Sequence, residues 1–353
     1  MKLFPHKAIS CNKLLTRRLS GIHAAWHFWY AVGFGGERGL RKLGLYGIHP
    51  LTQRYAHRRK TMMKMFDNNK VYLGMSGVKV SFDELVLPKG VIARRAYAHF
   101  MSPHMVALES PTREKLAPSP WKTVRGSGDK IVHWELEVDL TQKPEGAEAD
   151  DYVKTIVSLL RLGLSPQLHC FLISSVSFAS KAEFNDSEPE VSLWETNRVL
   201  VLKGANDELS QNTFGWIAEN LERCMDLIYK HYELKLAVSS LDEVHFQQSL
   251  PMSLVLLWGA LEAIFTKDKA ELRFRVSVMI ASYLEPDGGD KAYQLYKKVA
   301  KLYNERSKAA HGDNSVKQDT LLQTYELLYK AVEKMFEQNS VPTKESLERS
   351  LLG

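Results

Sequence analysis

Residues 251–265 are the most constraining segment of this chain, because they are almost entirely apolar and yet carry one ionisable group, Glu262. A helix that is apolar on every side is buried within a larger assembly of elements. A buried carboxylate without a partner is destabilising, so we expect a cation beside it. Arg306 is the first candidate for that cation, followed by Arg273 and Arg275. Such a pair either holds two helices in register or supports a catalytic group.

Arg306 lies near the end of a predicted helix over 289–311, in phase with the apolar face of that helix. The face follows helical spacing through Ala292, Leu295, Tyr296, Val299, Leu302, Tyr303 and Ala310. A guanidinium does not lose its proton on burial, so Arg306 needs an anionic partner or a phosphate. His311 follows the last turn, where partial negative charge favours a protonated imidazole suited to acid/base chemistry, and Gly312 is a typical terminator. Alternatively, Arg306 and Lys308 only complement the helix dipole and His311 only caps the helix.

The spacing of apolar residues predicts helices from about residue 212 onwards. We expect them over residues 213–236, 242–265, 269–284, 289–311 and 316–338. Connections as short as these imply a compact helical bundle over 212–338. We expect the final segment, 339–353, to be a loosely held tail.

Residues 65–205 alternate apolar and polar side chains in several places, as strands with one buried face do. The clearest alternation is that of Val132, Trp134, Leu136, Val138 and Leu140. Further strands are expected at 78–82, 91–100, 167–176 and 198–202. One amphipathic helix interrupts them, beginning after 148–151 and stopping at Gly163. The sequence therefore predicts an α+β protein, in which a mixed β-containing domain is followed by an all-α bundle.

Residues 1–64 form a basic, aromatic-rich segment with thirteen Lys or Arg and one acid, Glu37, which gives a net charge of +12. The whole chain carries +6, so the other residues sum to −6. Interleaved basic and aromatic residues suit nucleic acid, through phosphate contacts and base stacking. The same composition is also typical of a targeting segment or a flexible basic tail, and translation that begins at Met62, Met63 or Met65 would make the segment an artefact.

Composition limits the remaining classes of protein. No apolar stretch reaches the eighteen or so residues of a membrane span, so we expect no membrane partner. Cys11, Cys170 and Cys224 are widely separated and lack metal-ligand spacing. We therefore expect a reducing, cytoplasmic compartment, no disulfide framework, no metal and no cofactor.

Three segments together resemble the ApeA-like branch of the HEPN superfamily, over about the last third of the chain. They are Trp258–Phe265, Glu271–Leu284 and Leu302–Gly312, which contain a glutamate helix, a second helix, and a helix end that reads Arg-Ser-Lys-Ala-Ala-His-Gly. The resemblance implies a helical bundle, often a dimer, and in many members a metal-independent ribonuclease used as a toxin or in antiviral defence. It assigns catalytic roles to Arg306 and His311 and a supporting role to Glu262.

Other HEPN proteins carry a nucleotidyl-accepting tyrosine two residues after the histidine, where this chain has Asp313. The resemblance therefore favours RNA cleavage by an Arg-x4-His site shared across a homodimer. RNA supplies its own 2′-hydroxyl nucleophile, so cleavage requires a base, an acid and positive charge on the phosphate. Two copies of His311 and Arg306 around a two-fold axis provide these groups.

Two functions follow as expectations. The first is a metal-independent endoribonuclease whose β-containing domain senses a defence trigger or regulatory protein, or selects the RNA. The alternative is a non-catalytic HEPN module that binds nucleotide, nucleic acid or a protein partner. Residues 241–353 contain fifteen basic and sixteen acidic residues. A nearly neutral region offers RNA no broad electrostatic track, so RNA has to be held locally.

Overall fold

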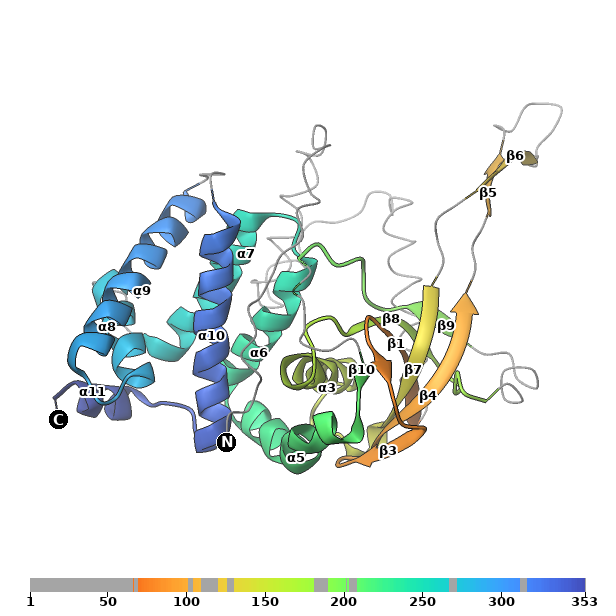
Figure 1. Ribbon diagram of the computed structural model, residues 1–353, viewed down its shortest axis with the longest axis horizontal. Coiled ribbons are helices and arrows are strands. Elements are labelled where there is room, and N and C mark those ends of the chain that lie inside the picture. The colour runs from red at the N-terminus through yellow and green to blue at the C-terminus, as the bar shows by residue number, and fades with distance from the viewer. Residues whose placement is uncertain are drawn as a thin grey trace, which may run out of the picture.

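The computed structural model describes residues 66, 69–100, 104–108, 120–125, 130–180, 190–200, 202, 208–266, 272–311 and 316–352. The basic segment 1–64, Gly312 and Asp313 lie outside these residues. A β-sheet occupies one end of the molecule and helices occupy the other (Figure 1). The expected α+β fold, an antiparallel sheet region followed by a helical region, is confirmed.

The main sheet has six strands, and every neighbouring pair is antiparallel. In spatial order the strands are β3 (Glu84–Leu87), β4 (Val91–Phe100), β7 (Lys130–Asp139), β1 (Lys70–Ser76), β8 (His169–Ser174) and β9 (Val191–Leu193). Two short pairs accompany it: β2 (Lys79–Val80) with β10 (Glu208–Leu209), and β5 (His104–Leu108) with β6 (Pro120–Arg125).

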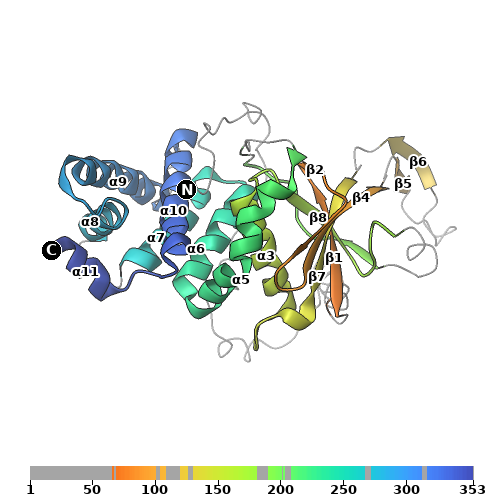
Figure 2. The ribbon, with the colours of Figure 1, turned by 60° about the horizontal axis from the view of Figure 1, so that its bottom comes forward.

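Strand β7 shows why the alternating pattern predicts this sheet. Trp134, Leu136 and Val138 are buried together with Ile156 and Leu160 of helix α3 (Ala149–Gly163). The indole of Trp134 also donates a hydrogen bond to the carbonyl of Val78, at 3.1 Å. Helix α3 therefore covers one face of the sheet, as Figure 2 shows.

The other face of β7 carries charge. Glu135 and Glu137 are buried there, and both accept hydrogen bonds from Arg94 Nη1, at 2.8 and 3.3 Å. Lys70 donates a further hydrogen bond to Glu137, at 2.6 Å. Cross-strand ion pairs of this kind stabilise the pairing of β1, β4 and β7.

The prediction of a strand over 198–202 is wrong for the part of that range that the structure describes. Residues 198–200 and 202 lie in no strand, because the backbone N–H groups of Val199 and Leu200 both donate to the carbonyl of His245, at 2.8 and 3.1 Å. Strand β1, near the middle of the sheet, was not among the predicted strands. Its apolar residues Val71, Leu73 and Met75 alternate along the strand, but Gly74 and Ser76 weaken the pattern on the other face.

The helical region follows from residue 211. Its helices are η3 (Gln211–Phe214), α5 (Gly215–Lys230), α6 (Tyr232–Glu243), η4 (Val244–Phe246), α7 (Leu250–Phe265), α8 (Leu272–Leu284), α9 (Gly289–Ala310), α10 (Gln318–Gln338) and α11 (Lys344–Leu352). The single helix expected over 213–236 is divided, because His231 has extended backbone angles, φ −127° and ψ 106°. None of the helices in the described part of the chain is long and apolar enough to cross a membrane.

Two features differ from the expected domain plan. Helix α3 packs on α5 and α6, and one hydrophobic cluster runs from the sheet into the bundle, so the regions on either side of residues 205–212 share a core. Residues 344–352 of the expected tail form α11, which packs on α8 and buries Leu347. Thr343 and Ser346 exchange side-chain to backbone hydrogen bonds, at 2.9 and 3.1 Å, which cap the start of this helix.

Candidate functional site

Glu262 and Arg306 form an ion pair between α7 and α9. Arg306 Nη2 lies 3.0 Å from Oε1 and 3.1 Å from Oε2 of Glu262, and only the second contact has hydrogen-bond geometry. The side chains are 24% and 21% exposed, so the pair lies at the edge of the bundle interior and not at its centre. Of the three expected cations, Arg306 is the one that meets Glu262.

Two aromatic rings, of Tyr303 and Trp258, lie beside this ion pair. The Arg306 guanidinium lies 5.5 Å from the centroid of the Tyr303 ring, and Trp258 packs edge-on against the same ring at 5.1 Å. Burial, followed by the negative charge of Glu262, raises the pKa of Tyr303. A cation above an aromatic face is favoured. Tyr303 therefore helps to hold the guanidinium that Glu262 anchors.

The pair leaves polar atoms without partners. Arg306 Nε and Glu262 Oε1 are buried and have no hydrogen-bond partner, and the same holds for Trp258 Nε1. An unsatisfied buried polar atom costs about 1–3 kcal/mol. Such atoms in a native fold call for a ligand, a water or a second molecule.

His311 occupies the end of α9. Its backbone N–H donates to the carbonyls of Ser307 and Lys308, at 3.2 and 3.1 Å, while its side chain is exposed. The side chain borders an open surface hollow lined by Lys301, Asn304, Glu305, Ser307, Lys308 and His311. His311 is therefore accessible to a ligand in a way that Arg306 Nε is not.

The structure does not bring Arg306 and His311 together within one chain. Five residues along an α-helix correspond to a rotation of about 140°. Arg306 therefore leaves α9 towards Glu262, whereas His311 leaves it on the solvent side. Within the described residues, no hydrogen bond, ion pair or ring contact joins the two side chains.

The other candidate cations have different partners. Arg273 Nη1 donates to Asn304 Oδ1 at 3.3 Å, and Arg275 borders a small hollow between α7, α8 and α11. Lys308 pairs with Glu305 at 2.8 Å and lies in the last turn of α9, as expected of a residue that complements the helix dipole. A role in complementing the dipole thus fits Lys308, and the ion pair shows that Arg306 has a further role.

A second buried cluster was not predicted. Arg161 of α3 is 2% exposed; its Nη2 donates to both carboxylate oxygens of Glu195, at 2.7 and 2.9 Å, and its Nη1 pairs with Asp242 of α6. Arg198 lies nearby, and the Phe246 ring is within cation–π distance of both arginines. The sequence feature that could have indicated this cluster is Arg161 itself, a cation directly after the apolar residues of α3.

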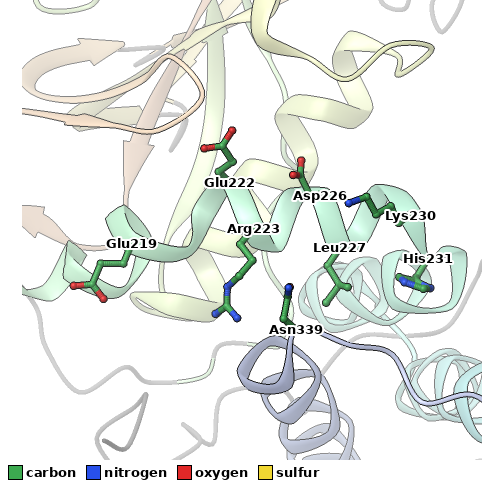
Figure 3. Close-up of a pocket in the computed structure, with 8 residues that line it drawn as sticks. All are labelled: Glu219, Glu222, Arg223, Asp226, Leu227, Lys230, His231 and Asn339. Carbon is green, nitrogen blue, oxygen red and sulfur yellow. The ribbon is translucent and has the colours of Figure 1, made fainter. Parts of the chain in front are cut away.

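A separate hollow runs along the outer face of α5 and reaches the end of α10 (Figure 3). It is lined by Glu219, Glu222, Arg223, Asp226, Leu227, Lys230, His231 and Asn339. Figure 3 shows the side chains of Glu219, Glu222 and Arg223 pointing in different directions, so they do not converge on one point. This hollow shares no residue with the Glu262–Arg306 pair, and we interpret it as a solvated helix face.

Comparisons of the chain with protein-family models, with curated proteins and with solved structures find no match. The HEPN resemblance consequently rests on the quoted segments around Glu262, Arg306 and His311. In the described residues, no group of three or more His, Cys, Asp or Glu side chains is arranged to hold a metal ion.

Proposed function

We propose that this protein is a metal-independent endoribonuclease of the HEPN type, in which Arg306, His311 and Glu262 act at a site shared by two copies of the chain. The observation that carries the proposal is the Glu262–Arg306 pair, which joins two of the three residues that the resemblance assigns. The guanidinium is anchored by a carboxylate and an aromatic ring, and the Arg306 side chain is still 24% exposed. An arginine in this state is suited to bind a phosphate oxygen.

The proposed reaction is transesterification within the RNA. The 2′-oxygen attacks the adjacent phosphorus and forms a 2′,3′-cyclic phosphate, while the bond from phosphorus to the 5′-oxygen breaks. One His311 takes the proton from the 2′-hydroxyl, and the second His311 gives a proton to the departing 5′-oxygen. Arg306 stabilises the negative charge that builds on the phosphate oxygens, and Glu262 positions Arg306.

The geometry of α9 supports the proposed dimer. Because Arg306 and His311 leave the helix on different sides, one chain does not direct both at the same phosphate. A two-fold axis repeats each group, so an Arg306 from one copy is able to act with a His311 from the other.

The test is incubation of labelled total RNA with the full chain in EDTA. We expect the wild type to cleave and to leave cyclic phosphate ends, and His311→Ala to be at least about 100-fold slower, the usual effect of removing a general acid or base. Both proteins must match in helicity and oligomeric state. Absence of cleavage, or cleavage that EDTA abolishes and a divalent cation restores, would overturn the proposal.

A non-catalytic HEPN module is the second candidate. It is favoured by the end of α9, where the backbone of His311 and the Lys308–Glu305 pair already satisfy local helix-end interactions. In that case Arg306 and His311 stabilise the dimer, and the protein acts by binding. RNA binding without cleavage by the wild type, together with loss of the dimer in His311→Ala, is the result that selects this function.

A further inference from the structure

We propose that single-stranded RNA binds along one exposed face of α9 and is delivered by that face to His311. This face, the α9 stripe, consists of Tyr293, Lys297, Lys301, Asn304, Lys308 and His311. All six side chains are exposed. The inference deepens the proposed function and rests on it for the role of His311, but the binding itself does not depend on cleavage.

The spacing of the stripe places its residues in a row. Successive members lie four, four, three, four and three positions apart. Five turns of an α-helix take about 18 residues, so these positions keep the same direction along α9. The stripe from Tyr293 to His311 is about 27 Å long at about 1.5 Å per residue. Arg306 belongs to another face, beside the buried Val299, Leu302 and Tyr303.

The fold concentrates positive charge around this stripe. Residues 272–311, which form α8 and α9, contain eight Lys or Arg and four Asp or Glu. Residues 241–265 contain three acids and no base, and residues 316–352 contain five bases and six acids. The helical region is therefore nearly neutral as a whole, but its α8–α9 hairpin has an excess of four positive charges. Figure 1 shows this hairpin at the outer end of the molecule. Local charge of this sign attracts a polyanion.

Aromatic rings lie at the start of the stripe. Tyr293 is 53% exposed, and Phe274 of α8 is 55% exposed. The ring of Tyr296 lies between them. Its centroid is 6.3 Å from that of Tyr293, in a stacked arrangement, and 6.2 Å from that of Phe274, in an edge-on arrangement. Lys297 Nζ lies 4.2 Å from the centroid of the Tyr293 ring. An exposed, supported ring beside a cation is the arrangement on which unpaired bases stack.

Two polar residues of the stripe, Lys301 and Asn304, lie between Tyr293 and His311. Arg273, also exposed, donates to Asn304 Oδ1, so the amide nitrogen of Asn304 stays available to a ligand. Lys301 and Asn304 line the same hollow as His311. The stripe therefore offers base stacking at one end, phosphate contacts along its length, and the proposed acid/base group at the other end.

The occupant is single-stranded rather than duplex RNA. A duplex keeps its bases stacked inside and presents mainly phosphates and hydroxyls, so exposed rings contribute little to binding it. An acidic peptide satisfies the lysines but does not need Tyr293 and Phe274. Only an unpaired nucleic acid uses both the charges and the rings.

The experiment measures binding of a 12-nucleotide 2′-O-methyl RNA, whose length lies in the usual range of about 4–16 nucleotides for one site. This probe lacks the 2′-hydroxyl nucleophile, so the proposed reaction does not destroy it. Fluorescence anisotropy of the full chain compares wild type, Lys297→Gln/Lys301→Gln and Tyr293→Ala. The control is Lys154→Gln/Lys330→Gln, which removes two exposed, ion-paired lysines from α3 and α10.

We expect the lysine pair on the stripe to weaken binding at least tenfold and to reduce the slope of log affinity against log salt by about 1.4, at about 0.7 per phosphate contact. Tyr293→Ala should weaken binding about tenfold, as loss of a stacking ring does. The control should change affinity by less than twofold. All the substituted residues are exposed, and circular dichroism verifies that each variant is folded.

The outcomes separate this inference from the proposed function. Binding that depends on the stripe, without cleavage of ordinary RNA, keeps the inference and removes the ribonuclease. Cleavage with equal binding by wild type and stripe variants removes the inference and keeps the ribonuclease. Equal affinity for a duplex of the same sequence, or tighter binding of polyglutamate with the same dependence on Lys297 and Lys301, also overturns the inference.

Discussion

Arg161 and Arg306 both pair with carboxylates, and they differ in burial and in how completely their nitrogens are bonded. Arg161 uses all three of its guanidinium nitrogens: Nε donates to the carbonyl of Leu168 at 2.8 Å, Nη2 to Glu195, and Nη1 to Asp242. Among the described residues, Arg306 bonds through Nη2, and its Nε has no acceptor. A buried guanidinium whose three nitrogens are all bonded has less capacity for a further ligand than one bonded through a single nitrogen.

The positions of the two arginines agree with that difference. The Arg161 cluster lies where α3, α6 and the sheet meet, and Glu195 also accepts from the backbone N–H of Cys170 at 2.8 Å. It therefore connects the β-containing region to the helical region. The Glu262–Arg306 pair connects two helices within the bundle and is about a quarter exposed. We infer that the first cluster serves the fold and the second serves the proposed reaction.

The strongest test of this comparison is Arg161→Met. The substitution keeps an unbranched apolar chain but removes the guanidinium, which leaves Glu195 and Asp242 without their cation. We expect it to destabilise the protein by about 3–5 kcal/mol. Urea denaturation followed by circular dichroism measures the change. Adding Asp242→Asn should recover part of the loss. A midpoint equal to that of the wild type, at equal m-value, contradicts a structural role for Arg161.

The matching change at the other arginine is Arg306→Gln. We expect RNA cleavage to fall by about 100-fold or more, as when a group that stabilises transition-state charge is removed. Stability should change by no more than about 1 kcal/mol, because the pair is partly solvated. Arg223→Gln, on the remote face of α5, is the control and should leave cleavage unchanged. Unfolding of Arg306→Gln with loss of activity would assign Arg306 to the fold instead.

Acid pH should destabilise the protein through His245, which lies beside the Arg161 cluster. His245 is fully buried, and its Nδ1 lies 3.0 Å from the carbonyl of Leu200. Burial, then the charges of Arg198 and Arg161, lowers the pKa of His245 well below 6.5. The unfolded chain binds a proton there below about pH 6.5 and the native protein does not, so stability falls as the pH falls.

The expected slope from His245 is at most about 1.4 kcal/mol per pH unit below about pH 6.5. Tyr325, whose ring meets the imidazole at 5.8 Å, is buried and neutral at these pH values and does not alter the sign. The measurement is urea denaturation at several pH values for wild type and His245→Gln. Identical pH profiles of the two proteins would show that His245 titrates normally.

The smallest expected effect is the coupling energy within the Glu262–Arg306 pair. A double-mutant cycle with Glu262→Gln and Arg306→Gln should give less than about 1 kcal/mol of stability coupling. The same cycle on Arg161 and Asp242 should give about 2 kcal/mol or more, because that pair is desolvated. Equal coupling energies would remove the distinction between the two arginines.

Much of the fold follows from the local spacing of apolar residues in the sequence. The alternation of Val132, Trp134, Leu136 and Val138 predicts β7, because residues two apart share one face of a strand. The apolar run of α7 predicts a buried helix, and its single carboxylate predicts a buried cation. These predictions need only the period of an element and the cost of burying charge. Where local signals were weak, as at β1 and α11, the elements were not predicted.

What the sequence by itself determined about this protein is therefore the type of each strongly periodic element, the different directions of Arg306 and His311 on their helix, and the need of Glu262 for a cation. Only the tertiary structure decided that Arg306 meets that need and that Arg161 bridges Glu195 and Asp242. The physical reason is that periodicity gives the direction of a side chain relative to its own helix. Its partner depends on how separate elements pack, and helix packing brought together residues 44 positions apart at Glu262 and Arg306.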